Sequence, residues 1–346
     1  MSKTTMALVA PAIIALFAAS PALGAPNVVA SVKPLHSLVA AVMDGVGTPE
    51  LLVEGAASPH GFSLRPSDAA KLESADIVFW IGEDLETFLP GPLSSLAGDA
   101  KIVEMMDQEG MTILGLREGG LFEAHSHDHE DREEHDHADH DGHDHGHEGH
   151  NHEHEHDHGH DDHGHDHSHD DHPHEHGDGH IWLDPQNARL MVAVITDTLI
   201  AADPDNGETY NANGQAVAAR IDALQTEIDA ALAPVRGKPF FVFHDAYHYF
   251  EARFDIEATG TFTVNPEIAP GAARLTEIRE RVEASAAACL FAEPQFSPAV
   301  IETIAEGTSA RVGVLDPLGA EIENGPGLYP TLLSALADSL IDCLAD

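Results

Sequence analysis

Histidine is the residue type whose number and spacing in this chain point most directly to chemistry. The chain has 346 residues and 27 histidines, and 22 of these histidines lie between His125 and His176. Three others stand apart from this run: His60 in A-S-P-H-G-F, His180 in H-I-W-L-D-P and His244 in F-F-V-F-H-D. Neutral imidazole is the commonest metal ligand in proteins, and zinc takes four nitrogen, sulfur or oxygen ligands. We therefore expect a metal site built on these three residues.

Each of the three histidines lies at the end of an apolar run or in a loop beside one. In open α/β sheets this edge is where ligands bind, so the three side chains are expected to meet although they are far apart in the chain. A single histidine in such a loop is more often hydrogen-bonded than bound to a metal, but three in equivalent places favour a shared ion. His36, which follows Pro34, is assigned to the surface.

A second pair, His244 and His248 in H-D-A-Y-H, superficially resembles the H-E-x-x-H helix of zinc proteases. The F-F-V-F run before His244 predicts the end of a strand rather than a helix, and Asp245 is one methylene shorter than the glutamate of that motif. The chain contains no G-x-S-x-G motif and no glycine-rich phosphate loop. These patterns favour binding over catalysis.

The histidine run is a polar segment without a core of its own. Between His125 and His176 it carries 19 acidic residues and one arginine, and we expect residues 125–179 to be disordered without metal. Its neutral imidazoles should bind metal weakly and lose it as the pH falls through about 6.5. It is either a reservoir that passes zinc to the three-histidine site or an acidic tether that binds metal incidentally. The expected accessory ligands include His125, His127, His129, His143, His145, His147, His152, His154, His156, His158 and His160.

The rest of the chain has the alternating pattern of an α/β protein. Residues 27–32 and 75–81 are strand-like, and a second set, 239–243, 288–291 and 311–315, alternates with helical stretches at 275–284 and 298–306, which predicts parallel sheets. Between the two sets, residues 205–235 form a long amphipathic helix unless it breaks near Gly214. We therefore expect an N-terminal lobe at 25–204, a linker helix at 205–235 and a C-terminal lobe at 236–346.

The N-terminus and the cysteines indicate the compartment. A lysine, an apolar run at 6–17 and small residues at 22–25 predict a signal peptide over 1–24, and no cysteine follows to carry a lipid anchor. Export to a periplasm favours a disulfide between Cys289 and Cys343, although their spacing also allows two small side chains in a core. The net charge of -44 excludes nucleic acid as a partner.

Several segments resemble the zinc-binding periplasmic component of the ZnuA-type ABC importer, from about residue 27 to the end apart from the histidine run. They are G-A-A-S-P-H-G-F-S-L-R-P-S-D, H-I-W-L-D-P, F-V-F-H-D-A-Y, F-T-V-N-P-E-I-A-P-G-A, F-A-E-P-Q-F and L-D-P-L-G. The resemblance implies two lobes joined by a long, rigid helix, with one metal ion in the cleft between them. It also implies that His60, His180 and His244 are ligands and that Cys289 and Cys343 form a disulfide.

The resemblance leaves the fourth ligand open. Asp316 matches the position where manganese-binding relatives supply a carboxylate, while Pro59 stands where some members have glutamate, so the fourth ligand is water or Asp316. Imidazole favours zinc over manganese, but nickel, copper and cobalt would also accept three nitrogens.

The expected function is that of a monomeric periplasmic receptor. It carries zinc as cargo to an inner-membrane ABC permease and its ATPase. The alternatives are a secreted zinc metallohydrolase that uses His244, His248 and Asp316, and an adhesin of the same fold.

Overall fold

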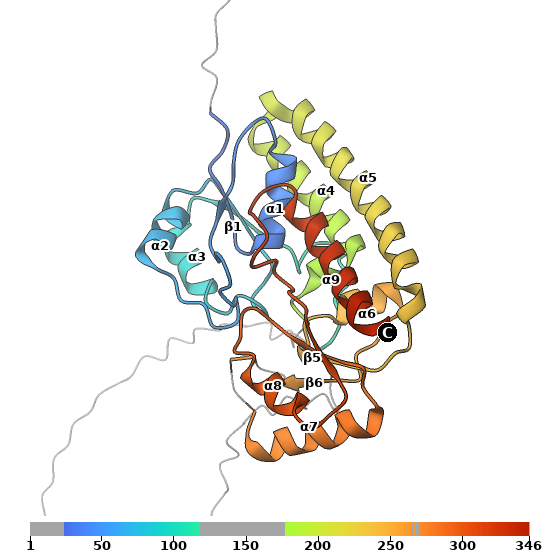
Figure 1. Ribbon diagram of the computed structural model, residues 1–346. Coiled ribbons are helices and arrows are strands. Elements are labelled where there is room, and N and C mark those ends of the chain that lie inside the picture. The colour runs from blue at the N-terminus through green and yellow to red at the C-terminus, as the bar shows by residue number, and fades with distance from the viewer. Residues whose placement is uncertain (1–23, 118–176, 264–265, 268–269, 346) are drawn as a thin grey trace, which may run out of the picture.

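The computed structural model describes residues 24–117, 177–263, 266–267 and 270–345 (Figure 1). The predicted signal peptide, apart from its last residue, lies outside the described residues, and so does the histidine run from His125 to His176 with all of its expected accessory ligands. Within the described ranges, no helix combines the length and the apolar character that crossing a lipid bilayer requires.

The first lobe is built on a parallel sheet with the strand order β2-β1-β3-β4. Its strands are β1 Val28–Ala30, β2 Glu50–Leu51, β3 Ile77–Trp80 and β4 Lys101–Glu104, and its helices are α1 Lys33–Val42, α2 Pro66–Glu73 and α3 Pro90–Leu96. Each of these helices has a proline in its first two positions, where its fixed φ suits a helix and its missing N–H costs nothing. The helices provide the crossovers that parallel strands require.

The second lobe repeats this arrangement with the strand order β6-β5-β7-β8, again with parallel neighbours. Its strands are β5 Phe240–His244, β6 Gly260–Thr263, β7 Cys289–Ala292 and β8 Arg311–Val314, and its helices are α6 His248–Phe254, α7 Ala272–Ser285 and α8 Ala299–Ala305. Two lobes with parallel sheets flanked by helices confirm the predicted fold class.

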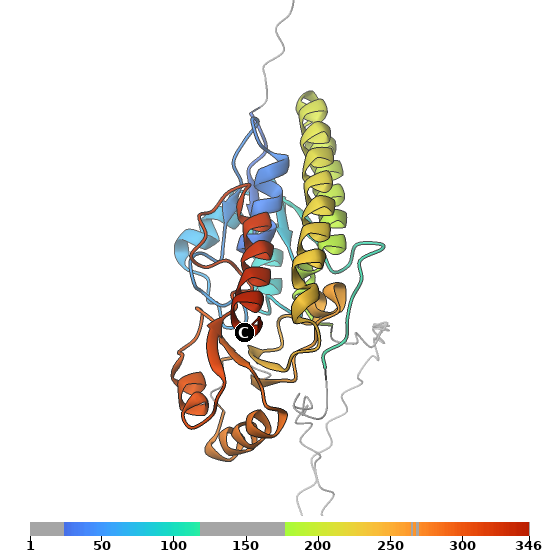
Figure 2. The same ribbon diagram turned by 45° about the vertical axis from the view of Figure 1, so that its right-hand side comes forward.

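A long helix, α5 Gly207–Leu232, connects the lobes, as predicted, with short 3-10 turns η2 Pro204–Asn206 and η3 Ala233–Val235 at its ends. Figures 1 and 2 show α5 running beside α4 Pro185–Ala202, which it contacts.

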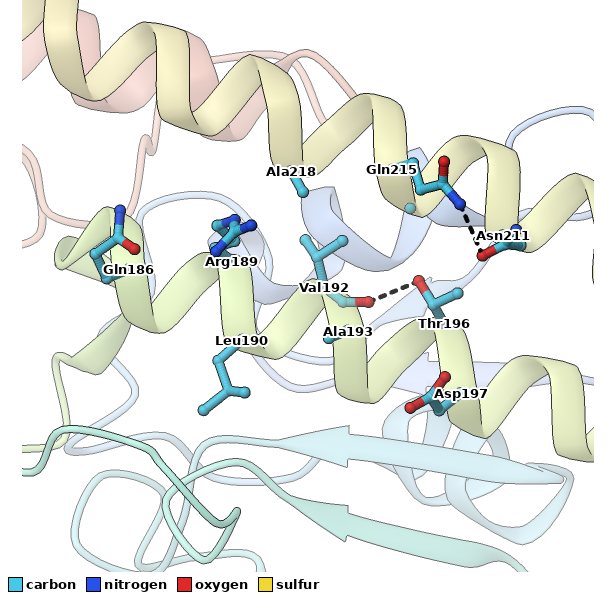
Figure 3. A pocket seen from close by; sticks show the side chains of 11 residues that line it. Gln186, Arg189, Leu190, Val192, Ala193, Thr196, Asp197, Asn211, Gln215 and Ala218 are labelled. Atoms are coloured by element: carbon cyan, nitrogen blue, oxygen red, sulfur yellow. Dashed lines mark hydrogen bonds between the residues drawn. The ribbon is translucent and has the colours of Figure 1, made fainter.

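Helix α5 continues through Gly214. A Cβ on Gly214 would lie 2.3 Å from Thr196 Oγ1, so glycine lets α4 and α5 approach closely. Figure 3 shows the groove that Thr196 lines opposite Asn211 and Gln215 of α5.

The two sheets share one hydrophobic core. Alternate strand residues face it, such as Val28 and Ala30 in β1 and Phe240 and Val242 in β5, and it includes buried side chains of α1, α4, α5 and the C-terminal helix α9 Leu328–Leu344. The outer sheet faces have separate cores, covered by α2 and α3 in the first lobe and by α7 and α8 in the second. Because side chains alternate along a strand, His244 at the end of β5 faces the shared core.

The C-terminal helix α9 ties the lobes together because it contacts α1 of the first lobe and β8 of the second. A disulfide joins Cys343 on α9 to Cys289 on β7, with 6.1 Å between their Cα atoms, and this confirms the predicted bond. The segment before α9 is also held by the first lobe. Lys33, only 4% exposed, donates from Nζ to the carbonyl oxygens of Gly319, Ala320 and Ile322 at 2.6, 2.9 and 2.9 Å.

The assignment of His36 to the surface is wrong. His36 lies in α1 and is only 6% exposed, because this helix is enclosed by the sheet of the first lobe, α5 and α9. Its ring Nε2 lies 3.0 Å from the carbonyl oxygen of Pro49, to which it donates when it carries the proton. Burial lowers the pKa of His36 although this hydrogen bond opposes the effect. The ring is a structural donor inside the first lobe.

Candidate metal centre

The structure brings His60, His180 and His244 together at the junction of the lobes. His60 lies in the loop between β2 and α2, His180 directly precedes the 3-10 turn η1 Ile181–Leu183, and His244 ends β5. The Nε2 atom of His180 lies 3.4 Å from that of His60 and 3.3 Å from that of His244. Each residue offers one ligand atom, and the three atoms lie within 4.8 Å of one another. Among the described residues this is the one group of three or more potential ligands that could hold a metal ion.

The spacing of the ring nitrogens matches tetrahedral coordination. Zinc–nitrogen bonds of about 2.0 to 2.1 Å at a tetrahedral angle place two ligand nitrogens about 3.3 to 3.4 Å apart. The Nε2 separations from His180 to His60 and to His244, 3.4 and 3.3 Å, fall at this value. Tetrahedral coordination by three imidazoles leaves one position for a fourth ligand.

Two buried carboxylates orient two of the rings. Asp178 Oδ1 lies 2.7 Å from His180 Nδ1, and Glu293 Oε1 lies 2.7 Å from His244 Nδ1. A carboxylate only accepts, so each Nδ1 must carry the proton and each Nε2 of the neutral ring keeps its lone pair. Such carboxylate partners also raise the basicity of a ligating imidazole. Both Nε2 lone pairs are thereby fixed toward the centre of the group.

The pKa values of His60 and His244 shift in opposite directions. Burial, reinforced by the nearby rings of His180 and His244, lowers the pKa of His60 well below its usual value. Burial also acts to lower the pKa of His244, but the charge and hydrogen bond of Glu293, together with the charges of Asp245 and Asp178, outweigh it, and the pKa is raised. His60 is therefore ready to bind a cation near neutral pH, whereas at His244 a metal ion competes with a proton.

The three histidines line a small cavity between the lobes. Its volume is about 10 Å³, which suits one ion or one water-sized ligand. The first lobe contributes the loop of His60, and the second contributes residues that follow β7 and β8. The other lining residues are Ser58, Pro59, Glu293, Gln295, Phe296, Pro317 and Leu318. The apolar members of this wall limit access of water to the group.

Asp316, the other candidate for the fourth ligand, is not part of the group. Its Oδ1 accepts hydrogen bonds from Gln295 Nε2 and from the backbone amides of Leu318 and Gly319, and its Oδ2 accepts one from the amide of Ala320. The carboxylate thus caps the turn that follows β8. An aspartate before Pro-x-Gly is typical of such a turn, so the motif L-D-P-L-G held a signal for this role.

His248 lies apart from the three histidines, at the first position of α6. It lines a different pocket together with Arg117 and Glu251. Arg117 forms ion pairs with Asp245, the residue after His244, and with Glu251 at 2.7 Å.

We did not predict this cluster or the roles of Asp178 and Glu293 from the sequence. Asp178 lies two positions before His180, and Glu293 lies in F-A-E-P-Q-F. Neither pattern alone identifies the partner of a histidine.

Replacing Glu293 with glutamine should change both the strength and the pH dependence of zinc binding. Loss of a carboxylate partner typically weakens metal affinity by about 10- to 100-fold. Zinc binds the neutral ring, so affinity in the unaltered protein falls as the pH drops through the raised pKa of His244. Without the Glu293 charge, burial lowers that pKa, and the acid loss of zinc should begin at lower pH.

Competitive zinc titrations of both proteins between about pH 5.5 and about pH 8 measure the two effects separately. An unchanged midpoint on the acid side would contradict the assignment of Glu293 as the group that raises the pKa of His244.

Two parallel-sheet lobes, a long connecting helix and a histidine-lined cavity at their junction define a two-lobed solute-binding protein, with a metal ion as the solute that the cavity fits. The chain belongs to the ZnuA family, described as zinc-uptake complex component A, periplasmic, whose profile matches residues 28–343.

Relatives of known name cover nearly the whole chain. The high-affinity zinc uptake system protein ZnuA of Brucella suis is 52% identical over 319 residues, which are 92% of each chain. The protein of the same name from Yersinia pestis is 39% identical over 322 residues, which are 93% of this chain and 92% of the relative. A crystal structure of ZnuA superposes with a TM-score of 0.69 at 22% identity, covering 92% of this chain and 99% of that one. This last likeness supports the fold.

Proposed function

We propose that this protein captures Zn²⁺ through His60, His180 and His244 and delivers it to an ABC permease and its ATPase. The observation that carries the proposal is that two imidazole nitrogens with fixed lone pairs face each other. The Nε2 atoms of His180 and His244 lie 3.3 Å apart while each Nδ1 faces a carboxylate. When both rings are neutral, neither Nε2 carries a proton for the other, whereas a divalent cation between them satisfies both lone pairs. The names of the relatives support zinc as this cation and uptake as the purpose.

In this role zinc is cargo rather than a catalyst. A catalytic zinc needs an open position and a neighbouring base that activates its water. In the hydrolase alternative His244, His248 and Asp316 would hold the catalytic zinc, but His248 and Asp316 both lie outside the histidine group. Asp316 accepts four hydrogen bonds, which engage both of its carboxylate oxygens. We therefore propose a receptor without enzymatic activity, acting as a monomer.

Replacement of His248 by alanine discriminates between the receptor and the hydrolase. If zinc is held by His60, His180 and His244, the His248→Ala variant should keep its zinc affinity within about twofold, because changes away from a binding site usually alter free energies by less than about 0.5 kcal/mol. The hydrolase alternative requires a large loss of tight binding in the same variant. Competitive titration with a chromogenic chelator measures the difference, and His244→Ala is the matched control in which binding must fall under either assignment.

We also propose export to the periplasm, with residues 1–24 removed as a signal peptide. The family description supports this compartment, and the disulfide between Cys289 and Cys343 suits an oxidising space. N-terminal sequencing of the protein recovered from a periplasmic extract is the test. A mature chain beginning near Ala25 is expected, and retention of Met1 in that fraction would contradict it.

The histidine run is proposed as a set of weaker zinc sites. Asp178, which follows the run, contacts His180. A deletion should therefore end at residue 176, because removal of Asp178 would also disturb the main site. We expect deletion of residues 125–176 to abolish several weak sites and to leave one tight site. Loss of the tight site in this variant would contradict the assignment of His60, His180 and His244.

A further inference from the structure

The loop between β7 and α8 contacts the metal cavity at three successive points. Glu293 holds His244, and Phe296 packs edge-on against the same ring, with 6.0 Å between ring centroids. Gln295 lies between them in sequence and lines the same cavity. Glu293 and Phe296 both contact the His244 ring, which explains their presence beside the cavity. The side-chain amide of Gln295 needs a separate explanation.

The orientation of the Gln295 amide is determined by Asp316. Gln295 Nε2 donates to Asp316 Oδ1 at 2.8 Å, and the same carboxylate is held by the backbone amides of Leu318, Gly319 and Ala320. A carboxylate that accepts from backbone amides cannot donate, so the opposite orientation would place two acceptor oxygens against each other. The amide nitrogen must therefore face Asp316.

This orientation leaves the Gln295 carbonyl oxygen as a free acceptor. Oε1 is buried and has no hydrogen-bond partner among the residues that the structure describes. A buried acceptor without a partner costs about 1 to 3 kcal/mol, so its retention next to a binding cavity indicates a ligand that donates to it. A bare metal ion bound by three imidazoles cannot donate a hydrogen bond, but a water molecule that completes its tetrahedral coordination can.

We propose that Gln295 is the positioning residue for the fourth zinc ligand, a water molecule whose proton its Oε1 accepts. This inference rests on the proposed zinc site at His60, His180 and His244. It gives Asp316 an indirect role, since the carboxylate orients the glutamine instead of binding the ion. Gln295 would also make the fourth position selective for water over anions. An anion that replaces the water has no proton to donate to Oε1, so the two electron-rich atoms would repel each other.

The test uses Gln295→Met, which keeps the length and volume of the side chain but removes the acceptor. Zinc affinity should fall by about tenfold, the lower end of the effect of losing a partner to a metal ligand. In the cobalt-loaded protein, whose visible spectrum reports the coordination of the ion, azide should bind at least about tenfold more tightly in the variant than in the unaltered protein. A purely structural role would not strengthen anion binding.

Gln225→Met is the matched control. Gln225 Oε1 accepts from Gln186 Nε2 at 2.5 Å, and neither residue lines the cavity, so the substitution also removes an amide pair but should leave both affinities unchanged. Thermal unfolding of the metal-free proteins checks that both variants fold. If Gln295→Met does not fold, the unaltered cobalt protein still tests the proposal, because tight azide binding to it would contradict selection for water.

Equal zinc and azide affinities in Gln295→Met and the unaltered protein would overturn the role of Gln295. Failure of the zinc site itself gives a different result, since His180→Ala would then bind zinc as well as the unaltered protein does. The two outcomes are therefore distinguishable.

Discussion

Replacement of His180 by alanine should weaken zinc binding by about 100-fold or more. His180 is the central member of the group, with its Nε2 within 3.4 Å of His60 Nε2 and 3.3 Å of His244 Nε2. Zinc sites with four ligands bind with about 10 to 16 kcal/mol, which corresponds to about 3 kcal/mol for each ligand, or about two orders of magnitude in affinity. Competitive titration against a chelator of known affinity at constant pH measures the loss.

His36→Ala is the control for this experiment. Its ring is as buried as that of His180, each residue being 6% exposed, but it lies in α1 next to the carbonyl oxygen of Pro49. We expect this variant to lose stability and to retain zinc affinity. Equal affinities of His180→Ala and His36→Ala would show that the three imidazoles do not share an ion.

Removal of the disulfide should lower the free energy of unfolding by about 4 kcal/mol. Cys289 and Cys343 are 54 residues apart in the chain, and a cross-link of this length restricts the unfolded chain by about that amount in the loop-entropy model. The bond also holds α9 on β7, so its loss weakens a contact between the last helix and the second sheet. Denaturant unfolding of the Cys289→Ala, Cys343→Ala double variant measures the effect.

The unaltered protein with its disulfide reduced is the appropriate comparison. The double variant and the reduced protein should agree, since both lack the cross-link, while the oxidised protein should be more stable than either. A loss of less than about 1 kcal/mol in both would show that the bond does not restrain the unfolded chain as the model assumes.

Most of the strands that could be predicted from sequence have apolar side chains on both faces. Segments such as residues 77–80 and 240–244 are apolar almost throughout because both faces of each sheet are covered. Strand β4 Lys101–Glu104 and strand β6 Gly260–Thr263 were not predicted, and each has two or fewer large apolar residues. Their strand conformation depends on pairing with a neighbour, which no local pattern records.

In the candidate site, too, only the features with a local sequence pattern could be predicted. The histidines could be located because strand ends and the loops beside them carry ligands in this class of fold. Their hydrogen-bond partners could not, since Glu293 reaches His244 only when β5 and β7 pair, and Gln295 meets Asp316 only through the turn after β8. The burial of His36 was missed for a related reason, because α4, α5 and α9, which are distant in sequence, pack against α1.

The core shared by the two sheets means that neither lobe is an independent folding unit. The predicted boundaries at residues 204 and 235 separate two sheets, but α9, at the C-terminal end, covers α1, near the N-terminal end. A chain cut after the linker helix would leave the apolar faces of α1 and α5 without the side chains that bury them. Exchange of one lobe for that of a relative would therefore require the last helix to be exchanged together with the first.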